Sequence, residues 1–245
     1  MKRGRALGRN TIFVLLAAAA LAFSAASLPV TSQQFERYVR EWSEPEGAFD
    51  SDNFISNETS YLHVIGDLHD RVRPGGVYLG VGPDQNLSYI AHTRPDLAII
   101  VDIRRQNMLE HLLFKTLFDQ AANRAEYLAL LFSREKPVVA PDATFEAILK
   151  AVRGSPSGEP VFLRNFAAVK AIIGNKYGLK LSPEDFSKID YVYRTFWQQN
   201  LDLRFSSIGR FNASNYPTYE QMLLETDRLG RQENYLSSED LFQWL

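Results

Sequence analysis

The chain has 245 residues, of which 45% are hydrophobic and 23% charged, a balance typical of globular and not of disordered proteins. A formal net charge of −2 excludes the strongly basic composition of many nucleic-acid binders, so no nucleic-acid partner is expected. The absence of cysteine excludes disulfides, a thiolate nucleophile and a thiolate metal site. A chain of this length can bury a full core, and residues 28–245 are expected to form one domain.

The first residues have the pattern of an export signal. Four basic side chains precede the apolar run 11–23, small residues follow at 24–26, and the first acidic residue is Glu36. This pattern predicts a signal peptide over residues 1–27 that is cleaved near Ala26. The alternative is an uncleaved membrane anchor through residues 11–28. In both cases the rest of the chain is expected to be exported, either periplasmic or membrane-anchored and facing outward.

The next part of the chain alternates predicted strands and helices. Apolar spacing and capping residues predict helices over 32–44, 56–72, 84–94 and 105–134, and strands over 77–81 and 97–103. Ser56 is the expected cap of the second helix, and the fourth is expected to break near Asn123. Strand–helix–strand–helix order builds a parallel sheet, and the branched run 97–103 is expected to be buried on both faces.

The second half of the chain is predicted to be mainly helical. A weak strand is expected over 135–141, and helices over 144–154, 164–178, 182–200, 218–230 and 237–245. The loop 154–160 is the best boundary, and residues 160–230 are a candidate helical subdomain. Open parallel sheets usually have about four to six strands. The two clear and two weak strands therefore predict an incomplete sheet, as in a C-terminally shortened chain.

The stretch 75–86, GGVYLGVGPDQN, closes the first strand with two glycines. In nucleotide-binding α/β units such glycines let the backbone approach the ligand, and an acid about 20 residues later binds ribose hydroxyls. Gly80, Gly82 and Asp102 fit this arrangement. The alternative is a plain tight turn, with Asp102 capping the next helix.

The residue after the turn bears on the choice of cofactor. Asp84 stands where a dinucleotide would place its pyrophosphate, and its charge would repel phosphate. S-adenosylmethionine carries no phosphate and is cationic at sulfur, so an acid nearby is favourable. S-adenosylmethionine is therefore the expected cofactor. The residues expected to hold it are Gly80, Val81, Gly82, Asp84, Gln85, Asp102 and Ile103.

Two resemblances support this expectation. VYLGVGPDQ and AIIVDIRRQNM resemble the first two motifs of class I S-adenosylmethionine-dependent methyltransferases, although Tyr78 replaces the usual acid and Asp84 the third glycine. FDSDNFISNE, SYLHVI, GGVYLGVGPDQN, VDIRR and NRAEYLALLFSR are similar to an uncharacterised, largely bacterial family with a methyltransferase-like fold. Its members continue into further strands beyond YLSSEDLFQWL. The resemblance implies an α/β fold with a Rossmann-like, methyltransferase-type parallel sheet, helix-rich and shortened at the C-terminus, without implying a particular reaction.

A polar cluster, DSDNFISNE over 50–58, precedes the second predicted helix. It is expected to close over the cofactor and bind a small-molecule substrate through Asp52, Asn53, Asn57 and Glu58. Glu58 or His63 is the candidate proton acceptor. The alternatives are a hard-cation site, for which the spacing of a calcium loop is lacking, and a surface turn that caps the helix. The four histidines lack the i, i+4 spacing of a metal pair, so no metal site is expected.

Two further features have open interpretations. Arg104 and Arg105 are expected to be solvated at a helix start, with an anionic ligand group as the alternative partner. Tyr191, Tyr193, Phe196 and Trp197 form either part of the core or a lid over a substrate.

Two functions from different classes remain. The first is an exported methyltransferase that uses S-adenosylmethionine. The second is a non-catalytic exported protein that retains the fold as a ligand-binding or interaction module, and the sequence leaves open whether the protein is an enzyme. The periplasm is not known to supply this cofactor, which favours the second. An open cleft between Asp102 and Gly80 would favour the first, and a cleft filled by side chains would favour the second.

Overall fold

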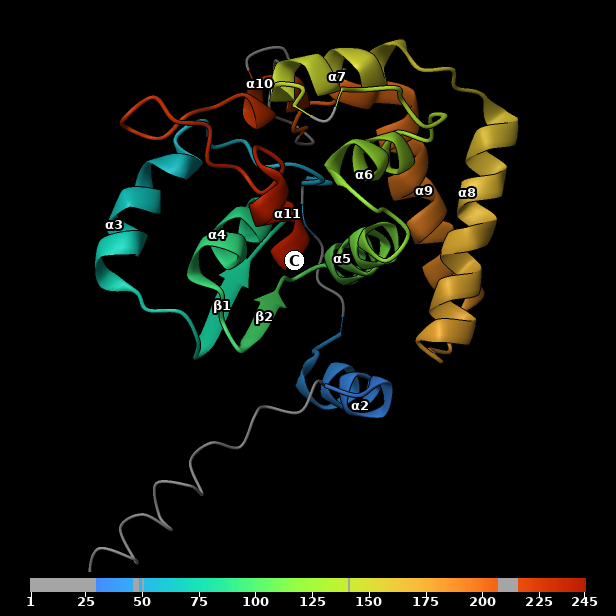
Figure 1. Cartoon of the computed structure of the whole chain (residues 1–245). Coiled ribbons are helices and arrows are strands. Elements are labelled where there is room, and N and C mark those ends of the chain that lie inside the picture. The colour runs from blue at the N-terminus through green and yellow to red at the C-terminus, as the bar shows by residue number, and fades with distance from the viewer. Residues whose placement is uncertain (1–29, 46–48, 50, 141, 207–215) are drawn as a thin grey trace, which may run out of the picture.

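The computed structural model describes residues 30–45, 49, 51–140, 142–206 and 216–245, so the expected signal peptide or anchor lies outside the described residues. A small parallel sheet lies at one side of a set of helices (Figure 1). The first half contains α2 (Ser32–Trp42), η1 (Tyr61–Val64), α3 (Ile65–Arg71), β1 (Val77–Val81), α4 (Gln85–Thr93), β2 (Leu97–Val101), α5 (Arg105–Phe118) and α6 (Arg124–Leu131). The second half contains α7 (Phe145–Gly154), α8 (Glu159–Ala171), η2 (Ile172–Lys176), α9 (Pro183–Gln199), η3 (Asn200–Asp202), α10 (Tyr219–Leu223) and α11 (Glu239–Trp244).

The sheet consists of β1 and β2, which run parallel with α4 as their connection. The register places Val77 beside Leu97 and Val81 beside Val101. The expected α/β alternation is therefore confirmed, in a helix-rich fold with a two-stranded sheet over the described residues. The weak strand expected over 135–141 is wrong for its described part, because residues 135–140 are irregular.

The prediction that strand 97–103 is buried on both faces is wrong. Successive side chains of a strand point to opposite faces, so Val77, Leu79 and Val81 share one face, and the parallel register adds Leu97 and Val101. Leu79 is 68% exposed and Val101 is 48% exposed. A parallel strand is buried on both faces only when helices cover both. α4 packs against β1, whereas this face is open to solvent in the described part of the chain.

The clearest helix boundaries follow their capping residues. The helix break expected near Asn123 is confirmed. The Asn123 side chain accepts a hydrogen bond from the Glu126 backbone N–H and caps the start of α6. α9 begins as expected, with Pro183 in its first turn and a reciprocal capping box between Ser182 and Asp185.

Three helix predictions need correction. Over 56–72 the chain turns helical only from Tyr61, because the Ser56 hydroxyl accepts from the Glu58 backbone N–H in a local turn. The helix expected over 164–178 already begins at Glu159, after Gly158 and with Pro160 in its first turn. The helix expected over 218–230 ends at Leu223 as the short α10.

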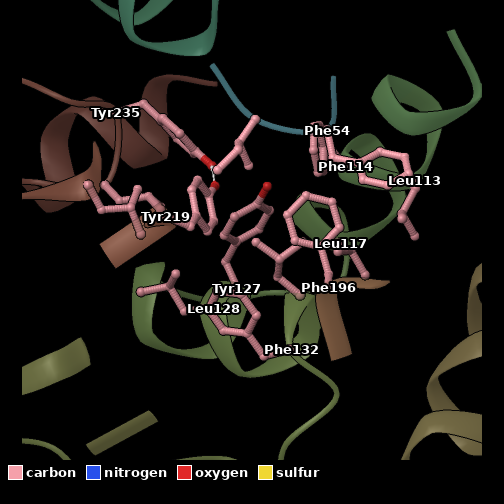
Figure 2. Packing of buried hydrophobic residues seen from close by; sticks show 14 of the residues in the cluster. Phe54, Leu113, Phe114, Leu117, Tyr127, Leu128, Phe132, Phe196, Tyr219 and Tyr235 are labelled. Carbon is pink, nitrogen blue, oxygen red and sulfur yellow. Dashed lines mark hydrogen bonds between the residues drawn. The ribbon is translucent and has the colours of Figure 1, made fainter. Parts of the chain in front are cut away.

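The core is one continuous cluster of buried side chains that extends from Phe54 to Phe242. Helix α5 packs against α9 within this cluster. Figure 2 shows Phe114 of α5 beside Phe196 of α9. The aromatic stretch of α9 is thus divided: Tyr193 and Phe196 are buried in the core, while Tyr191 is half exposed.

No helix in the described ranges is both long enough and apolar enough to cross a membrane.

Candidate functional site

The turn after β1 is held together by its own side chains. The Asn86 amide donates to the carbonyl oxygens of Val81 at 3.0 Å and Pro83 at 2.8 Å, and its Oδ1 accepts from the Tyr78 hydroxyl at 2.7 Å. A Cβ atom at Gly80 would lie 2.1 Å from Asn86 Oδ1 and 2.6 Å from Tyr78 Cε1. Gly80 therefore makes room for these two side chains, while Gly82, at φ +86°, takes the left-handed conformation of a tight turn.

β2 ends at Val101, two residues earlier than expected, and Asp102 follows it directly, with both of its carboxylate oxygens engaged. Arg104 Nε donates to Asp102 Oδ1 and Nη2 to Oδ2, each at 3.0 Å, and the Arg104 backbone N–H adds a bond of 2.9 Å. Each side chain is 8% exposed. The prediction that Arg104 is solvated is therefore wrong, because the guanidinium neutralises a buried carboxylate. Arg105 is not simply solvated either, since it forms a bidentate pair with Asp185 at 2.6 and 2.9 Å.

Arg104 also ties residues 51–53 to the end of β2. Its Nη1 donates to the carbonyl oxygens of Ser51 and Asp52. The Tyr191 hydroxyl of α9 donates to Asp52 Oδ2 at 2.9 Å, while its ring packs edge-on against Phe54 of the core. Asn53, at φ +49°, lies beside the turn, with its side-chain nitrogen 3.7 Å from the position of a Cβ at Gly82. Of the four predicted substrate residues, Asn53 thus lies beside the predicted cofactor turn and Asp52 beside the Asp102–Arg104 pair.

Asp84 is buried next to this turn and faces the tyrosines of the core. Its Oδ2 accepts a hydrogen bond of 2.5 Å from the Tyr219 hydroxyl. That hydroxyl lies 3.4 Å from the Tyr235 hydroxyl, and Figure 2 shows these two tyrosines facing each other. Burial raises the pKa of Asp84 to about 6, although the bond from Tyr219 opposes the shift. The adjoining cavity measures about 10 Å³, enough for one water molecule. Its lining includes Ile55, Ser56, Tyr61, Asp84, Gln85, Ser88, Tyr219 and Tyr235.

Two α5 side chains add buried ionisable groups to the site. Glu110 is fully buried and neither carboxylate oxygen has a hydrogen-bond partner; burial raises its pKa well above the usual value, and the nearby Asp84 adds to the rise. His111 Nε2 lies 2.9 Å from the Gly82 carbonyl oxygen, and burial lowers its pKa. The physical effect of burial is to favour the neutral form of both groups.

The remaining predicted residues are spread around this core. Val81 and Ile103 are 65% and 57% exposed. Gln85 lines the cavity, and its buried Oε1 has no hydrogen-bond partner. Glu58 is exposed, whereas Asn57 and His63 are half-buried. Within the described part of the chain, neither Glu58 nor His63 forms a hydrogen bond with the glycine turn or with Asp102.

The sequence did not place four residues correctly in the site: Arg104, which was expected to be solvated or to contact an anionic ligand, and Glu110, His111 and Tyr219, which were given no role there. Arg104 had a local signal in the sequence, because a basic side chain two positions after an acid at a strand end can fold back and pair with that acid. The contact between Tyr219 and Asp84 spans 135 positions and has no local signal. Glu110 and His111 lie within a helix, where the sequence alone does not tell a buried polar residue from a surface one.

The site contains buried acids and a histidine, which are groups that can transfer protons. The cavity beside them, however, has room for only about one water molecule. A ribose would have to displace Arg104 from Asp102, and the backbone beside Gly80 is covered by Tyr78 and Asn86. Of the two alternatives left open by the sequence, the structure therefore shows the filled one: side chains of the protein itself cover Asp102 and Gly80.

A family model for a domain of unknown function (DUF7790) matches residues 53–173. The match includes β1, the glycine turn, β2 and α5, and excludes Tyr219 and Tyr235. No curated protein matches the chain.

Proposed function

We propose that the protein is a non-catalytic exported module that retains the scaffold of a nucleotide-binding α/β unit and works by binding another molecule. The observation that carries this proposal is the buried Asp102–Arg104 pair, which uses the carboxylate that a nucleoside cofactor would need. The packing of Tyr78 and Asn86 against Gly80 supports it, because backbone covered by side chains cannot cradle a ligand. The exposed apolar face of β1 and β2 offers a surface for contact with a partner.

The second candidate function is that of a methyltransferase that binds S-adenosylmethionine at Gly80, Gly82 and Asp102. It is favoured by the positive φ of Gly82 and by the position of Asp102 at the end of the neighbouring parallel strand. In open α/β sheets ligands bind outside the carboxyl ends of the strands, where these residues lie. This function would require Arg104 to swing away and residues 51–53 to lift when the cofactor enters.

Calorimetric titration of S-adenosylmethionine into the full-length protein separates the two candidates. We expect no binding at ligand concentrations up to about 1 mM, because the ion pair and the turn side chains occupy the site. The same titration with Asp102→Asn tests the assignment of the carboxylate. Asp96→Asn is the matched control, since Asp96 accepts from the Gly76 backbone N–H at the opposite end of the sheet.

Binding to the wild type that Asp102→Asn weakens about tenfold or more, with Asp96→Asn unchanged, would overturn the proposal and establish the methyltransferase-type site. Absence of binding by a wild type that melts cooperatively supports the proposal. Near-ultraviolet circular dichroism of each variant establishes that its core is folded before the titrations are compared.

A further inference from the structure

Two histidines from different helices meet at the C-terminal end of α4, whose N-terminal end follows the glycine turn. His69 lies in the last turn of α3 and His92 in the last turn of α4, two helices that pack against each other. His69 Nε2 lies 3.0 Å from His92 Nδ1, and the ring centroids are 4.9 Å apart with the ring planes inclined by 59°. The two histidines are 23 positions apart in the sequence, so they do not show the i, i+4 spacing of a metal-binding pair on one helix.

The outer nitrogen of His92 is fixed by a second contact. His92 Nε2 lies 2.8 Å from the Glu233 carbonyl oxygen, which can only accept, so this nitrogen carries the proton. His92 Nδ1 is then unprotonated and accepts a hydrogen bond from His69 Nε2, which is the nitrogen of His69 that carries the proton. The Glu233 carboxylate is 3.5 Å from the same Nε2, and the His92 side chain is 5% exposed. Metal-binding histidines typically have this arrangement, with one nitrogen on the ion and the other donating to a carbonyl or carboxylate.

The spacing of the two facing nitrogens also fits a metal ion. Two nitrogen ligands at about 2.1 Å from an ion and at right angles to each other are about 3.0 Å apart. The observed 3.0 Å equals this separation. An ion would bind here with the proton of His69 moved from Nε2 to Nδ1 of the same ring, which leaves both facing nitrogens with a free lone pair. His69 is exposed, so water can reach the remaining coordination positions. Tetragonal coordination by nitrogen and oxygen is typical of Cu²⁺ and Ni²⁺.

The charges around the pair favour a cation. Arg231 is a nearby positive group, and it is paired with Asp227 at 2.6 Å and with Glu233 at 3.3 Å. Arg71 and Arg94, which follow the two histidines in sequence, are likewise paired, with Asp67 and Asp240, so each of these guanidinium groups is offset by a carboxylate. The C-terminal end of α4, where His92 lies, adds a partial negative charge.

We propose that His69 Nε2 and His92 Nδ1 bind one divalent late transition-metal ion, Cu²⁺ or Ni²⁺, with water as the other ligands and Glu233 orienting His92. No group of three or more His, Cys, Asp or Glu side chains in the described ranges is arranged around a metal position, so the protein supplies two ligands here. The ion would link α3 and α4 to the segment that contains Glu233. This site is separate from Asp102 and does not depend on the proposed function.

Titration of Ni²⁺ into the tag-free, full-length protein tests the site. We expect one equivalent to bind the wild type, with affinity at least about tenfold weaker in His69→Gln because one of two protein ligands is lost. His63→Gln is the matched control, since the structure gives His63 no histidine partner, and it should bind as the wild type does. Ni²⁺ should also raise the melting temperature of the wild type and of His63→Gln, but not of His69→Gln.

A second measurement identifies the ligands. The electron paramagnetic resonance spectrum of bound Cu²⁺ should show coupling to two imidazole nitrogens in the wild type, and one in His69→Gln. Equal Ni²⁺ affinity in the wild type and in His69→Gln would overturn the proposal. So would the absence of binding of both Ni²⁺ and Cu²⁺ up to about 1 mM, which would leave the pair as a hydrogen bond between two helices.

Discussion

At the scale of single residues, the unusual feature is the number of carboxyl groups inside the protein. Asp84 and Glu110 are both buried, and neither forms an ion pair in the described structure, whereas Asp102 is neutralised by Arg104. Burial favours the neutral form of an unpaired carboxyl, and this makes protein stability depend on pH. The two acids should therefore respond to pH in the opposite sense to Asp185, whose pKa the Arg105 guanidinium lowers to about 2.

Asp84 sets a specific pH window. Its pKa is about 6 in the folded state and 3.8 when unperturbed, so between these values the folded protein binds more protons than the unfolded chain. The free energy of unfolding therefore falls as pH rises from about 4 to about 6, by up to about 3 kcal/mol from this group. In Asp84→Asn the fall should be smaller. Urea denaturation at several pH values measures it, with Asp96→Asn, which changes an exposed acid, as the control. An undiminished fall in Asp84→Asn would contradict the assignment to this residue.

The residues of the site were only partly predictable from the sequence. Gly80, Gly82 and Asp102 could be placed because strand ends and glycine turns are set by local chemistry. Whether they face a ligand depends on side chains that fold onto them. Tyr78 and Asn86, which cover Gly80, are near it in sequence. Around them, Tyr191 bonds to Asp52 and Tyr219 bonds to Asp84 from 139 and 135 positions away. Local patterns could not supply those contacts.

At the scale of elements, α9 links the site to the core. Its N-terminus carries a capping box: the Ser182 hydroxyl accepts from the Asp185 backbone N–H, and Asp185 Oδ2 accepts from the Ser182 N–H, each at 3.1 Å. Asp185 also binds Arg105 at the start of α5. The same residues therefore start one helix and fasten it to another.

Ser182→Ala should lower the free energy of unfolding by about 1 kcal/mol, because it leaves a helix N–H without its partner. Ser187→Ala is the control on the same helix: its hydroxyl is exposed and donates to the Pro183 carbonyl oxygen, and its loss should cost less. Urea denaturation of both variants measures the difference. A cost for Ser187→Ala equal to that for Ser182→Ala would count against the cap as the source of the stability.

Elements with strong local signals were the ones that the sequence predicted well. β1 was located to the residue, and the starts of α6 and α9 followed from Asn123, Ser182 and Pro183. The signal at Ser56 was ambiguous, because the same hydroxyl that caps a helix also stabilises a local turn. The burial of β2 could not be inferred from its apolar run, since that depends on what packs against the sheet.

At the scale of the whole molecule, the fold places its sheet at the side of a helical core and leaves one apolar face bare. Val77, Leu79 and Val81 are each about two-thirds exposed, and Leu97 and Val101 lie beside them in register. In the described residues each strand pairs on one edge only. Contiguous exposed apolar surface and free strand edges are the features by which proteins associate.

We therefore expect the protein to self-associate through this face, and Leu79→Lys to shift it towards the monomer. The substitution should cost little stability, because Leu79 is 68% exposed. Leu229→Lys is the matched control: Leu229 is 77% exposed and lies outside the sheet, so the same added charge there should leave association unchanged. Static light scattering over a range of protein concentrations gives the mass of all three proteins. A wild type that remains monomeric at every concentration would contradict the expectation. Only Leu79→Lys places an ammonium group in the centre of the bare face. If both lysine variants dissociated equally, net charge and not this face would therefore control association.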